Sequence, residues 1–225
     1  MDKTDCPLDK LAEGNNFTTD KSKYGHNFNK LYHNYFQDLR DEPLNLLEIG
    51  LAAGHSIQMW SKYFTNAKLV SIDHDIKHYQ YSLNNDRITI IKGDQTDLKL
   101  LQDINGKYGP FDIIIDDGSH IDSYTKITFD TLFPLLKSGG LYVVEDLHTS
   151  YKKDLIDNLV NEPVFINYTK ELIDRVNSSG HCYSGDLNRC LTNGSPVCNH
   201  DKMEKMDKLI EFIHFYKSIV FIKKY

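Results

Sequence analysis

The run Phe111–Ile115, with the polar residues that follow it, constrains the fold more than any other part of the sequence. Its three consecutive isoleucines are typical of a short strand that is buried on both faces of a parallel sheet. A protein core does not accept Asp116, Asp117 and His120 directly after such a strand, so these side chains must lie at the edge of the sheet. Because ligands of open α/β sheets bind at the carboxyl ends of the strands, we expect a functional site there.

Strands and helices alternate on both sides of this run. Apolar, β-rich segments predict five parallel strands, at Leu46–Ile49, Lys68–Asp73, Arg87–Ile91, Phe111–Ile115 and Leu141–Val144. Helical patterns separate them, so the sequence predicts a doubly wound, Rossmann-like α/β sheet. Near the end of the chain, Ile210–Tyr216 and Ile219–Ile222 are separated only by Lys217 and Ser218. They predict an antiparallel hairpin at the sheet edge, which gives a mostly parallel sheet of seven strands.

The length of 225 residues, of which 40% are hydrophobic, favours one domain over residues 1–225. Within it we expect an N-terminal arm and helix (1–40), a cofactor-binding core (44–150), a variable loop (179–202) and the hairpin (209–225). Residues 1–25 contain few apolar side chains, so we interpret them as an arm outside the core. We also expect a helix at Phe28–Leu39, a short helix around Tyr79–Leu83, and a helix after His120 that is capped by Asp122 or Ser123.

Charge and hydropathy exclude several classes of partner. The net charge of −6 gives no electrostatic footprint for nucleic acid. The polar N-terminus lacks the apolar region of a signal peptide, and no apolar run approaches the roughly 18 residues of a membrane helix. We therefore expect a cytoplasmic protein that binds neither nucleic acid nor membrane.

Three predicted strands end in residues suited to a nucleoside cofactor. After the first strand, Gly50 and Gly54 would let the backbone approach a ligand closely, with the small Ala52 between them. Asp73 follows the second strand, where an acid accepts hydrogen bonds from a ribose. Asp94 and Gln95 follow the third strand, where a carboxylate could accept a hydrogen bond from an adenine amine. Each of these residues, taken alone, is also common in ordinary turns and helix caps.

The first turn also argues against a nicotinamide dinucleotide. It lacks the full dinucleotide fingerprint, and Glu48 stands where a pyrophosphate would be repelled. A cationic end of a cofactor would be attracted there.

The fourth and fifth strands end in an acidic cluster. If these strands are neighbours, the carboxylates of Asp116, Asp117, Glu145 and Asp146 converge at one edge of the sheet. A hard divalent cation would relieve their repulsion, and oxygen ligands suit Mg²⁺ better than zinc. The alternative is that some of these acids, such as Asp146, only cap helices. His120 is either a general base or an ordinary turn histidine.

Together these motifs resemble one enzyme family. Glu48-Ile-Gly-x-x-x-Gly54, Ser71-Ile-Asp73, Lys92-Gly-Asp-Gln95, Ile115-Asp-Asp-Gly-Ser-His120 and Val144-Glu-Asp-Leu-His148 are similar to the metal-dependent sugar O-methyltransferases of macrolide biosynthesis, the macrocin and mycinamicin type. The resemblance implies a class I fold that binds S-adenosylmethionine (SAM). It assigns Mg²⁺ to Asp117, Glu145 and Asp146, and makes His120 the base. It places around SAM the following residues: Lys21, His26, Glu48, Gly50, Ala52, Gly54, Asp73, Asp94, Gln95 and Asp116.

The resemblance implies Mg²⁺-dependent transfer of the SAM methyl group to a sugar hydroxyl, with His120 taking the proton. The acceptor would be a nucleotide sugar, a glycan or a glycosylated natural product, and a homo-oligomer is compatible with the sequence. One alternative is an O-methyltransferase that acts on a catechol-like diol. Another is a non-catalytic SAM-binding module that serves as a partner in glycan assembly.

The segment 179–202 matches no motif. Cys182, Cys190, Cys198 and His200 could hold zinc, but their spacing lacks the short pair of a zinc knuckle. A loop over the acceptor pocket is the alternative.

Overall fold

The computed structural model describes residues 6–15, 19–79, 85–152, 164–179 and 206–225. Its strands form one seven-stranded sheet in the order β3-β2-β1-β4-β5-β7-β6. Their bounds are β1 Asn45–Ile49, β2 Lys68–Asp73, β3 Ile88–Lys92, β4 Ile113–Asp116, β5 Leu141–Val144, β6 Ile210–Tyr216 and β7 Ile219–Lys224. Strands β1 to β5 are parallel, and β7 pairs antiparallel with both β5 and β6. The predicted sheet and hairpin are confirmed.

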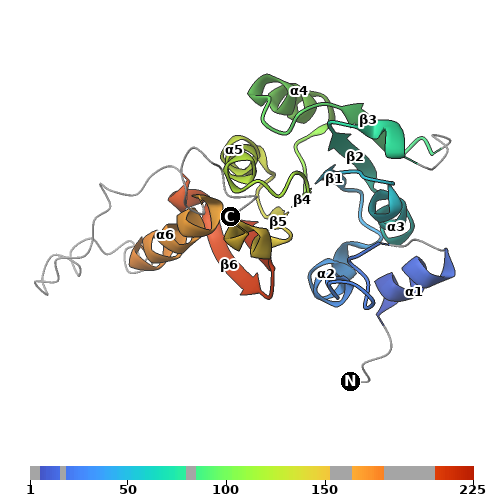
Figure 1. The fold of residues 1–225 in the computed structure, drawn as a ribbon, viewed down its shortest axis with the longest axis horizontal. Helices are drawn as coiled ribbons and strands as arrows, with labels where there is room; N and C mark the ends of the chain where they lie inside the picture. Colours follow the sequence, from blue (N-terminus) through green and yellow to red (C-terminus); the bar gives the residue numbers. More distant parts are fainter. Residues whose placement is uncertain (1–5, 16–18, 80–84, 153–163, 180–205) are drawn as a thin grey trace, which may run out of the picture.

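Helices cover both faces of the sheet (Figure 1). One face carries α1 Pro7–Gly14, α2 Asn29–Phe36 with η1 Gln37–Leu39, and α3 His55–Tyr63, and the other carries α4 Leu98–Tyr108, α5 Asp122–Leu132 with η3 Phe133–Leu135, and α6 Val164–Ser179. Strand residues alternate between the two cores, so that Leu46 and Ile113 face α1 to α3 while Leu47 and Ile114 face α4 to α6. None of the helices in the part of the chain described has the length and apolar character needed to span a bilayer.

The N-terminal part contributes to the core, which the sequence did not predict. Leu8 and Ala12 are buried, and their spacing of four residues places them on one side of α1, against α2 and α3. Lys21 is also buried, with 1% of its surface exposed. Leu8, Ala12 and Lys21 therefore belong to the packed interior although Tyr24 is exposed, because a few well-spaced apolar side chains suffice to attach a short helix.

The start of α5 also differs from its predicted form. Asp122 is the first residue of the helix, and no side chain caps the helix N-terminus. The Asp122 carboxylate instead accepts hydrogen bonds from Ser150 Oγ and from the backbone N–H of Phe165, both at 2.6 Å. Asp122 thereby connects α5 to the 3-10 helix η4 (Leu147–Tyr151) and to α6.

Two further predicted segments lie partly outside the residues that the structure describes. Near Tyr79 the chain forms only one 3-10 turn, η2 Ile76–His78, and residues 80–84 are not described. Of the segment 179–202, only Ser179 is described, at the end of α6. The three late cysteines and His200 therefore lie outside the described residues. A further 3-10 turn, η7 Asp207–Leu209, leads into the hairpin.

Candidate active site

The loop after β1 approaches the loop after β4 very closely. Gly50 has a φ of +91°, and a Cβ atom there would lie 2.0 Å from the backbone oxygen of Asp117. Gly54, at φ 83°, forms the N-cap of α3, and Ala52 is also left-handed at φ 44°. Only glycine fits at position 50, because any side chain there would collide with the backbone of Asp117. The glycine therefore allows the two loops to lie in contact.

Asp73, at the end of β2, holds the first loop in place. Its Oδ2 accepts the backbone N–H groups of Leu51 (2.8 Å) and Ala52 (3.2 Å). Its Oδ1 accepts the N–H of Asp75 and lies 3.1 Å from Nδ1 of the exposed His74. Although burial opposes ionisation, these amides lower the pKa of Asp73 below its ordinary value.

Asp94 and Gln95 lie at the end of β3, and both line the same pocket. Asp94 accepts hydrogen bonds from the backbone and hydroxyl of Thr96, which lower its pKa. Gln95 bridges two elements, since its Oε1 accepts the N–H of Ser119 at 2.7 Å and its Nε2 donates to Thr128.

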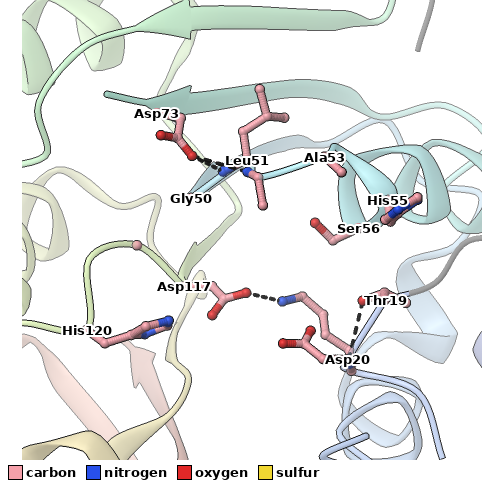
Figure 2. A pocket seen from close by; sticks show the side chains of 13 residues that line it. Thr19, Asp20, Gly50, Leu51, Ala53, His55, Ser56, Asp73, Asp117 and His120 are labelled. Atoms are coloured by element: carbon pink, nitrogen blue, oxygen red, sulfur yellow. Dashed lines mark hydrogen bonds and ion pairs between the residues drawn. The ribbon is translucent and has the colours of Figure 1, made fainter. Parts of the chain in front are cut away.

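Two pockets adjoin at the carboxyl ends of the parallel strands. The first, of 340 Å³, is lined by the Gly50–Ala53 loop, by Thr19 to Lys21, and by Asp117, Gly118 and His120. Figure 2 shows Asp117 and His120 on the opposite side of this pocket from Thr19. The second, of 380 Å³, extends past Asp94 and Gln95. Because both are lined by Gly50, Asp73 and Gly118, they form one elongated cleft, which we call the strand-end cleft.

Four predicted cofactor contacts do not line this cleft: Gly54, His26, Glu48 and Asp116. Glu48 is fully buried under α3, where it accepts hydrogen bonds from Ser56 Oγ (2.9 Å) and Trp60 Nε1 (3.1 Å). Asp116 is also buried and lies near the hydroxyl of Tyr142 and the N–H of Gly118. Burial raises the pKa of each carboxyl group to about 7. Both side chains lie inside the protein, and neither reaches the strand-end cleft.

Lys21 reaches from the N-terminal segment into the acidic cluster. Its Nζ forms ion pairs with Asp117 and Glu145, at 2.9 Å from Oε1 of Glu145. Tyr32 donates its hydroxyl hydrogen to the same Glu145 oxygen. Burial and the neighbouring Asp117 raise the pKa of Glu145 well above its ordinary value. Burial alone would lower the pKa of Lys21, but the two carboxylates outweigh it and raise that pKa.

Asp146 lies among three histidines. It has a left-handed backbone (φ 55°), and no hydrogen bond occupies its buried Oδ1 atom. His26 Nε2 (3.6 Å) and His148 Nδ1 (3.8 Å) approach Oδ1, and His120 Nε2 lies 3.9 Å from Oδ2. Asp146 precedes η4 but does not cap it with its side chain, so helix capping does not explain this carboxylate.

Of the three predicted metal ligands, Asp117 and Asp146 share a cluster of potential ligand atoms that does not include Glu145. Potential ligand atoms of Asp117, His120 and Asp146 lie within 4.8 Å of one another, as do those of Asp20, His26 and Asp146. Glu145 adjoins this set through Asp117 and Lys21. We call Asp117, Glu145, Asp146 and Lys21, with His120, the acidic centre. It contains three carboxyl groups and one ammonium group, so acidic groups outnumber basic ones.

Two residues beside the acidic centre had no predicted role in the site. Tyr32 was predicted only as part of the apolar face of a helix, yet its hydroxyl contacts Glu145. His148 forms part of a motif that carried the resemblance, but it was given no role. The sequence does hold one indication for Tyr32. A buried tyrosine hydroxyl needs a hydrogen-bond partner, so a tyrosine on the apolar face of a helix predicts a polar group nearby.

Comparison with known proteins shows what this geometry resembles. Residues 47–147 match the model of a methyltransferase domain family. This part of the chain resembles a methyltransferase domain. It begins within β1 and includes β2 to β5, and thus every strand end that lines the cleft. The chain is also 33% identical over 218 residues to mycinamicin VI 2''-O-methyltransferase from Micromonospora griseorubida, covering 92% of this chain and 50% of that protein.

Other relatives extend the similarity of the methyltransferase domain. A 3'-O-methyltransferase of a 2-methoxy-rhamnosyl tetracenomycin C from Streptomyces olivaceus is 39% identical over 140 residues, covering 59% of this chain and 35% of that protein. Among solved structures, the MycE methyltransferase of the mycinamycin pathway, in complex with Mg, SAH and mycinamycin VI, has a TM-score of 0.77 at 30% identity. That match covers 96% of this chain and 54% of MycE. The chain spans about half the length of the mycinamicin relatives, and its resemblance to sugar O-methyltransferases is confirmed.

Proposed function

We propose that this protein transfers a methyl group from SAM to a hydroxyl group of a sugar, with Mg²⁺ at the acidic centre. The observation that carries the proposal is the position of Asp146. Asp146 lies in a cluster with Asp117 and His120, both of which line the strand-end cleft, and its buried Oδ1 atom has no hydrogen-bond partner. A cofactor in the cleft and a cation at the acidic centre would therefore be neighbours.

The cleft supports a nucleoside cofactor with a charged, flexible end. Its Asp94–Gln95 part has the aromatic Tyr124 and the apolar Ile72 and Ile121 in its lining, which suit an adenine ring. Asp73 stands at the junction of the two pockets, and the exposed His74 can turn away from its Oδ1 atom to free it for a ribose hydroxyl. The remaining part, near Lys21 and the Gly50–Ala53 loop, would take the methionine end.

The acidic centre fits a hard divalent cation. Asp117, Glu145 and Asp146 provide carboxylate oxygens, which are the ligands that Mg²⁺ prefers. The buried Oδ1 of Asp146 has no donor from the protein, and such an atom is costly unless something binds it. These three residues would hold the ion. Lys21, which now contacts two of them, would have to share or leave those oxygens.

His120 is the residue proposed to move the proton. Its Nε2 lies 3.9 Å from Oδ2 of Asp146, so this nitrogen, which we propose as the proton acceptor, points into the acidic centre. SAM would supply the methyl group on a sulfonium, and Mg²⁺ a positive charge that polarises the sugar hydroxyls. Transfer of the methyl group would leave S-adenosylhomocysteine (SAH), and His120 would take up the proton that the acceptor hydroxyl loses.

The names of the relatives support a sugar acceptor. They describe methylation of mycinamicin VI and of rhamnosyl tetracenomycins, and the solved MycE complex contains Mg and SAH. We therefore propose a small glycosylated molecule as the acceptor of this protein.

The proposal is tested by measuring cofactor binding, metal binding and turnover separately. Calorimetry should detect SAH binding to the wild type, and Asp73→Ala should weaken it. Asp146→Asn retains a residue that tolerates positive φ and should abolish Mg²⁺ binding while SAH still binds. SAH formation with rhamnoside acceptors should require Mg²⁺ and stop when a chelator is added.

Asp103→Asn, on the surface of α4, is the matched control and should leave all three measurements unchanged. Full turnover in the presence of chelator would exclude the metal. Competition by a nicotinamide dinucleotide at the SAH site would contradict the cofactor assignment.

A further inference from the structure

The hydroxyl group of Tyr32, on α2, reaches the acidic centre from inside the protein. Tyr32 is fully buried, and its hydroxyl donates a hydrogen bond to Oε1 of Glu145. Lys21 also donates to this carboxylate and contacts both of its oxygens, Oε1 at 2.9 Å and Oε2 at 3.0 Å. Tyr32 does not line the strand-end cleft, so its hydroxyl serves the carboxylate and not a ligand of the cleft.

Aromatic packing fixes the position of this hydroxyl. The Tyr32 ring meets the ring of Trp60 on α3 edge-on, with the centroids 5.1 Å apart, and that of Phe221 on β7 at 5.5 Å. Its backbone N–H donates to the carbonyl oxygen of Phe28 at 2.9 Å. Because a helix, a second helix and a strand hold the ring in a close-packed core, the hydroxyl cannot follow the Glu145 carboxylate if that group turns.

The two donors to Glu145 would respond differently to a divalent cation. Lys21 carries a positive charge that the cation repels, and its flexible side chain can turn away. The Tyr32 hydroxyl is neutral and fixed, so it stays at Oε1. A cation that bound both carboxylate oxygens would have to share Oε1 with this hydroxyl, whereas a cation that bound Oε2 alone would not.

A carboxylate that offers one oxygen favours Mg²⁺ over Ca²⁺. Mg²⁺ is small and demands near-ideal octahedral geometry, in which one carboxylate oxygen fills one position. Ca²⁺ is larger, takes about six to eight oxygen ligands, and often binds both oxygens of a carboxylate. Partners of metal ligands orient those ligands and thereby tune the site.

We propose that Tyr32 is a positioning residue, which restricts Glu145 to one free oxygen and so makes the acidic centre prefer Mg²⁺ to Ca²⁺. This inference rests on the proposed function, because it takes the acidic centre as the metal site. Loss of the hydroxyl should therefore change which ion binds, an effect that a purely structural role would not produce.

The test measures the affinity of the protein for Mg²⁺ and for Ca²⁺ by calorimetric titration with each chloride salt. Tyr32→Phe removes the hydroxyl and keeps the packed ring. It should weaken Mg²⁺ binding by about tenfold or more and leave Ca²⁺ binding unchanged or tighter. Tyr63→Phe is the matched control and should keep the wild-type preference. Tyr63 is equally buried, and its hydroxyl lies 2.7 Å from Nδ1 of His33, outside the acidic centre.

Lys21→Met is a second variant that separates the two donors. It removes the competing ammonium group and leaves the Tyr32 hydroxyl at Oε1 of Glu145. Both ions should therefore bind more tightly, with the ratio of their affinities unchanged. Melting curves and SAH titrations verify that each variant is folded, and the Lys21→Met ratio tests the inference even without a folded Tyr32→Phe protein.

An unchanged ratio of Mg²⁺ to Ca²⁺ affinity in Tyr32→Phe would overturn the inference and leave the proposed function intact. Equal weakening of both ions is one form of that result. An altered ratio in Lys21→Met or in Tyr63→Phe would overturn it as well. If the wild-type protein bound neither ion, the proposed metal site would itself fail, and the inference with it.

Discussion

The ammonium group of Lys21 lies 2.9 Å from Oε1 of Glu145, and both side chains are at least 98% buried. Asp117 contacts the same ammonium group. One positive charge from the N-terminal segment therefore balances part of the negative charge of the acidic centre. A cation bound there would compete with Lys21 for carboxylate oxygens.

Replacing Lys21 should expose this competition. Lys21→Met leaves the buried Glu145 and the half-buried Asp117 without a counter-charge, and breaking a buried pair costs about 3 to 5 kcal/mol. The melting temperature should fall sharply in chelator and recover with MgCl₂ by more than it does in the wild type. Lys23→Met, which breaks only the exposed pair with Glu13, should melt close to the wild type. Equal melting of Lys21→Met and wild type in chelator would show that the buried pair contributes no stability.

Replacing His120 should slow methyl transfer without loss of either ligand. His120 has a left-handed backbone (φ 58°), so Asn is a better replacement than Ala because it tolerates that conformation. His120→Asn should lower the turnover rate by about 10² to 10⁴ and keep SAH affinity. The rate should partly recover at high pH, where more of the acceptor hydroxyl ionises without help. A wild-type rate in this variant would leave His120 as an ordinary turn residue.

Glu48 should make the protein less stable as pH rises. Burial raises its pKa in the folded protein to about 7, although Lys21 opposes the shift. Because the folded state binds the proton more tightly than the unfolded state, the stabilisation is complete below about pH 4 and is lost by about pH 7.

Glu48→Gln mimics the neutral form and should remove this dependence. The difference between wild type and variant in unfolding free energy should change by up to about 3 kcal/mol between pH 4 and pH 8. Denaturant unfolding at both pH values measures it. Parallel pH profiles for the two proteins would mean that Glu48 titrates normally.

Two glycines should respond to alanine in opposite directions. Gly50→Ala places a Cβ atom 2.0 Å from the backbone oxygen of Asp117 at a positive φ, so it should destabilise the fold and weaken SAH binding at least tenfold, or by about 1.4 kcal/mol. Gly106, inside α4, has open space around it, and Gly106→Ala should stabilise by roughly 0.5 to 1 kcal/mol. Chemical denaturation and SAH titration of both variants provide the comparison. Tight SAH binding by Gly50→Ala would contradict the close approach of the two loops.

The sheet was predictable because its strands are short apolar runs between strong turn signals, as at Ile113–Asp116. Burial on both faces leaves such segments little choice of conformation. The same prediction placed Asp73, Asp94 and Gln95, because a residue at the carboxyl end of a strand has its position set by that strand.

Side-chain direction was not predictable from the same patterns. Glu48 turns under α3 because Ser56 and Trp60 place two donors four residues apart on one side of that helix. Asp122 bonds to Ser150 and Phe165, which lie 28 and 43 residues further along the chain. Neither partner is visible in a local pattern. The burial of Lys21 was the least predictable, because it depends on Asp117 and Glu145, which the sheet brings close to it.

The pairing of Lys21 also has a consequence for biosynthesis. Its partners Asp117 and Glu145 lie 96 and 124 residues later in the chain, so the ribosome makes the lysine long before the carboxylates. During translation the N-terminal segment has no acidic centre to enter, and it can dock only after β4 and β5 have joined the sheet. The electrostatic balance of the acidic centre can thus be established only after Glu145 has been synthesised and β4 and β5 have paired.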